Sequence, residues 1–227
     1  ALKDKVCALG VQKDKVEVIP NGVNLEKFKP QSMCLARERL NLDERKKIIL
    51  FVGSFEKVKG INYLLRAFNN ICNNKSIEKP LLILIGQGSL LDTITKKIHN
   101  YKIEENTIIQ GKVDHDKLPL WMNASDVLCL PSLNEGRPNV IYEAMACGLP
   151  IVASEVGGIS EMVISDEIGE LVPCKQVSEL EISLIHALGK KWDRKLIRGY
   201  ALQNSSTKYA KDLFFVYSGR NINGNLR

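Results

Sequence analysis

The sequence predicts an α/β protein: a Rossmann-like parallel sheet with helices on both faces. Short apolar runs typical of buried strands alternate with stretches whose apolar residues recur at helical spacing. Many of these runs end in small residues that open a loop. Strands that are apolar on both faces are typical of parallel sheets, because the crossover helices cover both sides. Ligands of such sheets bind outside the carboxyl ends of the strands. The loops that follow the strands are therefore the candidate sites: 53–60, 86–90, 111–116, 131–139 and 154–160.

The first 47 residues show a weaker pattern. Residues 1–10 fit a helix that ends at Gly10, a residue type common just after helix ends. Residues 16–19 alternate apolar and polar, and Pro20-Asn21-Gly22 follows, which predicts a strand and then a turn. A short helix is expected around residues 35–40.

From residue 48 onward, strands and helices alternate regularly. The apolar runs 48–52 and 81–85 predict the first two strands of the sheet. Residues 60–73 between them carry Leu64, Leu65, Phe68 and Ile71 at helical spacing. The same reasoning gives further strands at 107–110, 127–130, 151–153 and 169–172, and helices at 90–101, 117–124, 138–147 and 159–163.

The composition excludes several classes of protein. The 227 residues are 44% apolar and 26% charged, as in ordinary globular domains. The longest apolar runs have five residues, whereas a membrane span needs about 20. The six cysteines lack the spacing of a zinc site and are expected to be reduced thiols, so we expect a cytoplasmic protein without structural zinc.

The net charge of +6 is concentrated at the C-terminus. Residues 189–227 contain nine basic and two acidic side chains, whereas the rest of the chain is nearly neutral. Ala210, Leu213, Phe214 and Tyr217 predict an amphipathic helix after the cap candidates Ser205 and Ser206. A solvated basic face is the preferred interpretation. Binding to an acidic partner, or peripherally to acidic lipid at the inner membrane face, is the alternative, and nucleic acid is not an expected partner.

Two motifs have ordinary interpretations. Gly86-Gln87-Gly88 begins like a dinucleotide fingerprint, but Leu91 replaces the third glycine, so a tight turn is favoured over an NAD site. Asp114-His115-Asp116 looks like a DxD metal motif, yet it precedes the helix expected at 117. We therefore predict that Asp114 or Asp116 caps that helix. His99 and His186 are predicted to be surface residues of helices.

The strongest segment runs from Pro131 to Gly148. Pro138 suits the first position of a helix, whose N-terminal N–H groups and dipole favour a phosphate. Glu135 precedes this helix and is either a cap or a functional carboxylate. Glu143 interrupts an apolar stretch, where a carboxylate is costly without a partner. A ligand hydroxyl is the expected partner, and a solvated helix residue is the alternative.

These residues carry a resemblance. Glu135-x7-Glu143, between Pro131-Ser132 and Ala144-Met145-Ala146-x-Gly148-x-Pro150, resembles the donor-binding half of retaining glycosyltransferases of family 4 (group 1), which have the GT-B fold. The match runs in order from about residue 2 to residue 173. Its other motifs are Ile19-Pro20-Asn21-Gly22-Val23-Asn24, Val52-Gly53-Ser54-x4-Lys59-Gly60, Gly86-x-Gly88, Gly111-x-Val113 and Gly157-Gly158-Ile159-x-Glu161.

The resemblance implies a role for each matched residue. Lys59 would contact the donor diphosphate, Glu135 would face the donor sugar at the reacting centre, and Glu143 would hold the ribose hydroxyls. Many members have Arg where this chain has Ser54, and Lys57 or Arg137 is the expected substitute. No metal or cofactor is implied, because Lys59 and the helix dipole would stabilise the leaving diphosphate. The remaining donor contacts implied are Gly53, Ser54, Lys112 and Val113, the last two with the base, and Gly136, Arg137, Pro138, Asn139 and Val140.

The resemblance also implies a division of the chain. Residues 1–20 would be the end of an N-terminal acceptor domain and its linker, 21–188 the nucleotide-sugar-binding domain, and 189–227 a basic helical tail. The whole enzyme would move a hexose from a nucleoside diphosphate sugar to an acceptor hydroxyl, and the isolated chain would be inactive. A stand-alone nucleotide-sugar-binding or regulatory module is the alternative, and a sugar-nucleotide epimerase is less favoured. The base, the sugar and the acceptor stay open.

Overall fold

The computed structural model describes residues 2–74 and 78–218 and contains a six-stranded parallel sheet. Its strand order is β3-β2-β1-β4-β5-β6, so the direction in which strands are added reverses between β1 and β4. The predicted Rossmann-like α/β fold is confirmed. The strands are β1 (Ile48–Val52), β2 (Leu81–Ile85), β3 (Thr107–Gly111), β4 (Val127–Leu130), β5 (Ile151–Ser154) and β6 (Gly169–Val172).

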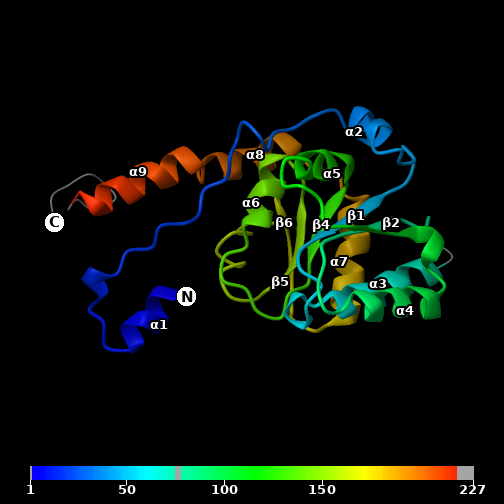
Figure 1. Ribbon diagram of the computed structural model, residues 1–227, viewed down its shortest axis with the longest axis horizontal. Helices are drawn as coiled ribbons and strands as arrows, with labels where there is room; N and C mark the ends of the chain where they lie inside the picture. The colour runs from blue at the N-terminus through cyan, green and yellow to red at the C-terminus, as the bar shows by residue number, and fades with distance from the viewer. Residues whose placement is uncertain (1, 75–77, 219–227) are drawn as a thin grey trace.

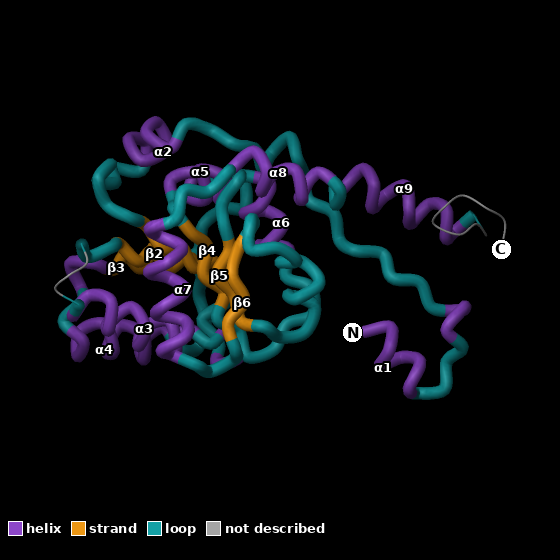
Figure 2. The backbone as a smooth tube through the Cα atoms, turned by 180° about the vertical axis from the view of Figure 1, so that it is seen from behind, coloured by secondary structure: helices purple, strands orange, loops and turns teal. Residues whose placement is uncertain are grey.

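Helices cover both faces of the sheet (Figures 1 and 2). Alternate residues of each strand point to opposite faces. In β1, Leu50 faces a core shared with α5 (Leu118–Ala124), α6 (Asn139–Ala146) and α8 (Arg194–Leu202). Ile49 faces the other core, with α3 (Ile61–Asn73), α4 (Leu91–Tyr101) and α7 (Val177–Gly189). Both side chains are fully buried, which explains the uninterrupted apolar runs of the central strands.

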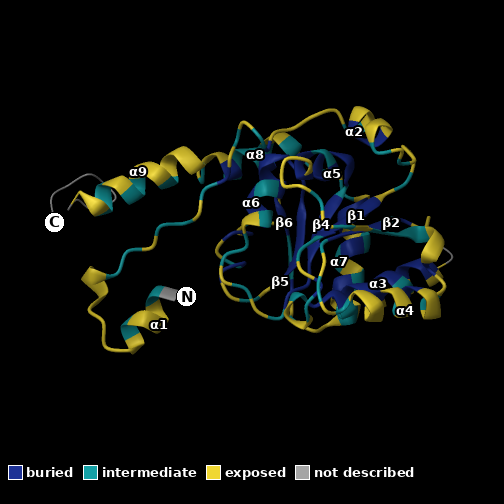
Figure 3. Ribbon diagram, viewed as in Figure 1, coloured by how far each residue is buried: buried dark blue, intermediate teal, exposed yellow. Residues whose placement is uncertain are grey.

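The ends of the described chain extend away from this body (Figure 1). They carry α1 (Leu2–Ala8), the 3-10 turn at Lys13–Lys15 and α9 (Ser206–Tyr217), all largely exposed (Figure 3). The strand predicted at 16–19 is wrong: this segment forms no strand. Its alternating pattern is not enough, because a strand also needs a neighbouring strand to bond its backbone groups.

The link from residue 20 to the sheet is anchored by the C-terminal helices. Val23 accepts a hydrogen bond from Ser206 N and donates one to Asn204 O, both at 2.9 Å. The Arg198 side chain of α8 donates to the carbonyls of Phe28 and Ala146, which joins this link to α6. α2 (Met33–Arg39) lies between the link and β1. The proposed division at residue 188 stays a prediction.

α9 has the predicted cap and an exposed apolar face. Ser205 accepts a hydrogen bond from Lys208 N at 3.1 Å. Phe214 and Tyr217 are 66% and 83% exposed. Within residues 2–74 and 78–218, no helix is both long and apolar enough to cross a membrane.

The helix predicted at 159–163 is wrong. The segment forms turns, although Ile159, Met162 and Val163 are buried as a helical face would be. It follows Gly157-Gly158, and so short a stretch yields too few intrahelical bonds to offset helix nucleation.

Candidate functional site

The candidate site lies where the strand order reverses, at the carboxyl ends of β1 and β4. The loop after β1 contains a 3-10 turn (Lys57–Lys59) that presents Lys59. The loop after β4 presents Glu135. Lys59 Nζ lies 2.6 Å from Glu135 Oε1, and Ser132 Oγ donates to the same oxygen at 2.8 Å. Open α/β sheets bind ligands at such a reversal.

Close backbone contacts hold these loops together. Leu133 N donates to Val58 O at 2.7 Å, and a side chain on Gly60 would place its Cβ 1.8 Å from Pro131 O. On the other side, a Cβ on Gly157, which has φ +58°, would lie 1.8 Å from Glu135 O. Only glycine allows both this backbone angle and this approach. The Lys59–Glu135 pair is therefore held on a rigid base.

Glu135 is not a helix cap. The N-cap of α6 is Pro138, without a side-chain cap, and Asn139 is the first helical residue, one position later than predicted. The Glu135 side chain is 9% exposed and that of Lys59 is 23% exposed. Among the described residues, Oε1 receives both hydrogen bonds and Oε2 receives none. The ammonium group has three donors, so Lys59 keeps donor capacity for an anion.

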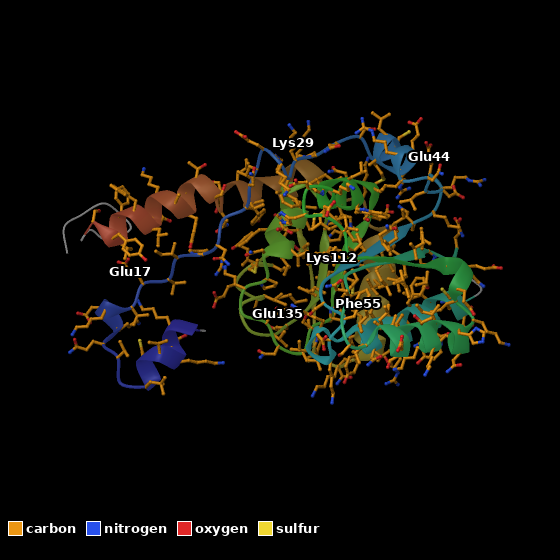
Figure 4. The ribbon with its side chains drawn as sticks, viewed as in Figure 1. Glu17, Lys29, Glu44, Phe55, Lys112 and Glu135 are labelled. Carbon is orange, nitrogen blue, oxygen red and sulfur yellow. The ribbon has the colours of Figure 1, made fainter. Side chains whose placement is uncertain are left out.

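Two hollows flank the pair. One, of about 250 Å³, is lined by Glu135, Gly136 and Arg137 together with Gly158 and residues of the N-terminal segment. The other, of about 350 Å³, brings together four predicted residues: Gly53, Ser54, Lys112 and Val113. A Cβ on Gly53 would lie 3.9 Å from Lys59 Cδ, which places Lys59 beside the second hollow as well. Lys112 and Glu135 lie on separate loops of the sheet body, whereas Glu17 lies on the extended N-terminal segment (Figure 4).

The N-terminus of α6 contributes the remaining predicted residues. Asn139 Oδ1 accepts a hydrogen bond from Asn21 Nδ2 at 3.1 Å, and Val140 packs against the core. The first N–H groups of a helix have no acceptor within it, so Asn139 and Val140 offer free donors.

Glu143 has a partner within the protein that the sequence did not reveal. Its side chain is 12% exposed, so the interpretation as a solvated residue is wrong. Glu143 Oε1 lies 2.8 Å from Nε2 of His115, on the loop after β3. The only sequence signal for His115 was its place in a loop at the ligand edge of the sheet. His99 and His186 are exposed helix residues, as predicted.

The predicted caps of α5 are also wrong. The N-cap of α5 is Lys117, which makes no side-chain cap bond. Asp114 lies 3.5 Å from Lys117 Nζ, and Asp116 is paired with Lys27. The hydrogen bond from Lys27 holds the pKa of Asp116 below its ordinary value. The described residues contain no group of three or more His, Cys, Asp or Glu side chains arranged to hold a metal. Binding without a metal stays a prediction.

The two expected substitutes for a cation at Ser54 differ in their surroundings. Arg137 Nη1 lies 3.1 Å from Glu161 Oε2, and the same guanidinium donates to the Tyr142 hydroxyl. Lys57 is exposed in the turn that presents Lys59. Which of them replaces the missing arginine stays a prediction.

Comparison with known proteins decides the family. Residues 35–219 match the family described as glycosyl transferases group 1. The chain belongs to this family.

Proteins similar to this chain are found both by sequence and by fold. D-inositol 3-phosphate glycosyltransferase from Xylanimonas cellulosilytica is 32% identical over 180 residues, which cover 75% of this chain and 42% of that protein. Sucrose-phosphate synthase from Thermosynechococcus elongatus superposes with a TM-score of 0.84 at 28% identity, covering 96% of this chain and 56% of that one. HepE from Anabaena, solved with UDP and glucose, gives 0.81 at 20% identity, covering 95% and 60%. The group 1 chain described here thus spans about half the length of the relatives it matches.

Proposed function

We propose that the chain is the donor-binding domain of a retaining family 4 glycosyltransferase that moves a hexose from a nucleoside diphosphate sugar to an acceptor hydroxyl. The observation that carries this proposal is the Lys59–Glu135 pair at the reversal of the strand order, beside the N-terminus of α6. A cation, a free carboxylate oxygen and free backbone donors meet there. HepE, which has a similar fold, was solved with UDP and glucose, which supports a nucleotide sugar as the ligand.

The diphosphate would bind between Lys59 and the start of α6. Lys59 donates one hydrogen bond to Glu135 and can donate others to phosphate oxygens. The free N–H groups and the dipole of α6 add positive potential on the other side. Negative charge grows on the diphosphate as the sugar leaves, so these fixed donors would stabilise the transition state without a metal ion.

The sugar would lie against Glu135. Because Lys59 and Ser132 both bond Oε1, Oε2 is the atom that remains for a sugar hydroxyl or the reacting centre. The base would lie in the hollow lined by Lys112 and Val113, and the ribose would reach Glu143. Retention of the anomeric configuration is part of the proposal and rests on the resemblance.

The acceptor would be held outside the residues described here. The relatives are about twice as long as the matched region, and we propose that an N-terminal domain supplies the acceptor site. Residues 1–20 would then lead from that domain, 21–188 would bind the donor, and 189–227 would form the basic tail. Orienting an acceptor can supply roughly 7–11 kcal/mol of the barrier, so the 227-residue chain alone should bind the donor without transferring it.

Two variants separate the proposed roles. Glu143→Gln should weaken nucleoside diphosphate binding, because hydrogen bonds from ribose to a charged acceptor contribute about 1.5–3 kcal/mol. Glu135→Gln should bind nearly as wild type, yet abolish transfer in the full-length enzyme. Calorimetry on the chain and a radiolabelled transfer assay on the full-length enzyme measure the two effects. Retention is read from the anomeric proton of the product by NMR. If Glu135→Gln transfers at the wild-type rate, the role assigned to Glu135 is wrong.

A further inference from the structure

Lys27, His115 and Glu143 form a hydrogen-bonded chain of three side chains. Lys27, on the link before the sheet, lies with its Nζ 2.7 Å from Nδ1 of His115, and Nε2 of the same ring lies 2.8 Å from Glu143 Oε1. The first contact joins residues 88 positions apart, and the second joins residues 28 positions apart. Nothing in the proposed donor site requires His115, so the contact calls for an explanation.

The charges fix the direction of both hydrogen bonds. A lysine ammonium group can only donate, so Nδ1 of His115 must accept. A neutral imidazole that accepts at one nitrogen carries its hydrogen on the other. His115 therefore donates from Nε2 to the carboxylate of Glu143. Lys27 also pairs with Asp116, whose side chain is 89% exposed, so the lysine is held from two sides.

Phe28 adds a packing contact on one side of the ring. The imidazole is 57% exposed and lies tilted against the buried ring of Phe28, with centroids 5.1 Å apart and 57° between the ring planes. Within residues 2–74 and 78–218, His115 is the only hydrogen-bond partner found for the Glu143 side chain. It bonds Oε1 and leaves Oε2 without a bond to the protein. A carboxylate in a nearly buried position is thus oriented by one fixed donor.

We propose that His115 is a positioning residue for Glu143. It holds Oε1 so that Oε2 faces the ribose hydroxyls, and it thereby sets the preference of the site for ribonucleotides over deoxyribonucleotides. Lys27 acts one step further out, by fixing the tautomer and the orientation of the ring. This inference rests on the proposed function, in which Glu143 contacts the ribose.

The test compares two ligands that differ only in the ribose hydroxyls. UDP, GDP and ADP are titrated by calorimetry into the 227-residue chain, and the base that binds best is then used as its 2′,3′-dideoxy diphosphate. His115→Ala should weaken binding of the ribonucleotide by about 5-fold, within the range for one net hydrogen bond. Binding of the dideoxy form should not change, because it has no ribose hydroxyl to donate a hydrogen bond to Glu143.

Three further variants make the test specific. His115→Gln keeps an N–H donor toward Glu143 and should restore most of the ribonucleotide preference. Lys27→Met keeps the aliphatic stem and should lower the preference less than His115→Ala does. His99→Ala removes an exposed histidine that pairs with Glu104 on another helix and should match wild type. Urea unfolding of each variant checks that it is folded.

Each result has one meaning. If His115→Ala weakens both ligands equally, or weakens neither, His115 does not position Glu143 for ribose. If it strengthens ribonucleotide binding, His115 competes with the ribose and the proposal is wrong. Wild-type protein that binds no nucleoside diphosphate contradicts the proposed function, and the inference about His115 fails with it. The wild-type titration therefore tells the two failures apart.

Discussion

Replacing Lys59 by methionine should lower the free energy of unfolding by about 3 kcal/mol, because it leaves the Glu135 carboxylate without its cation. Breaking a buried ion pair typically costs about 3–5 kcal/mol. The lower end applies here for two reasons. Lys59 is 23% exposed, and Ser132 still donates to the same oxygen at 2.8 Å. Methionine keeps the packing of the aliphatic stem, so the loss in the free energy of unfolding comes from the missing positive charge.

A second substitution measures the interaction energy between Lys59 and Glu135. Glu135→Gln in the Lys59→Met background removes the uncompensated charge, so most of the lost stability should return. Urea unfolding followed by circular dichroism gives the free energy of unfolding for both single variants and the double variant. Lys57→Met, two residues away and exposed in the same turn, is the control and should match wild type. Additive effects in this double-mutant cycle would refute the reasoning, because contacting residues must show an interaction energy.

The same variants separate stability from binding. The double variant should fold nearly as well as wild type, yet bind nucleoside diphosphates much more weakly, because it lacks the proposed phosphate donor. If this folded variant binds nucleoside diphosphates with wild-type affinity, Lys59 does not contact the phosphates.

Three further predictions concern the frame around the site. Gly157→Ala should destabilise the protein by about 1–3 kcal/mol, because φ is +58° and the new Cβ would meet Glu135 O; Gly136→Ala, with open space around it, should not. Asp126→Asn should cost about 3 kcal/mol in urea unfolding by breaking the pair with buried Arg37, whereas Asp43→Asn, in an exposed pair, should have no measurable effect. Thiol labelling of the native protein near neutral pH, read by mass spectrometry, should modify exposed Cys34 and spare the buried thiols until urea is added. Burial raises the pKa of Cys72 to about 11, that of Cys147 to about 12, and that of Cys129 as well.

The strands of the sheet were predicted well, because each is recognised from a short apolar run of consecutive residues. Apolar runs such as 81–85 are buried on both faces and cannot be mistaken for amphipathic surface segments. In the structure, Gly60 and Gly157 lie where these loops approach each other most closely. The helix α7 was not predicted, although Leu184 is fully buried within it, and α8 lies within the expected helical tail.

The errors have a common physical origin in long-range contacts. Residues 16–19 alternate like a strand but form none, because a local pattern cannot supply the neighbouring strand that a sheet requires. Asp116 suits a cap in sequence, but Lys27, 89 positions away, engages it instead. Glu143 also has a protein partner that local patterns did not reveal, His115, from a loop that only the folded sheet brings near. Contacts between side chains on different loops at the edge of the sheet can be identified only from the folded structure.

The most direct test of the proposed site is calorimetric titration of UDP, GDP and ADP into the 227-residue chain in the presence of EDTA. We expect at least one of them to bind without a divalent metal, because Lys59 and the N-terminus of α6 supply the positive potential. The Lys59→Met/Glu135→Gln variant should lose most of this affinity, while Lys57→Met should keep it. Binding that requires added Mn²⁺ or Mg²⁺, or that is equally strong in the Lys59→Met/Glu135→Gln variant, would contradict the central claim.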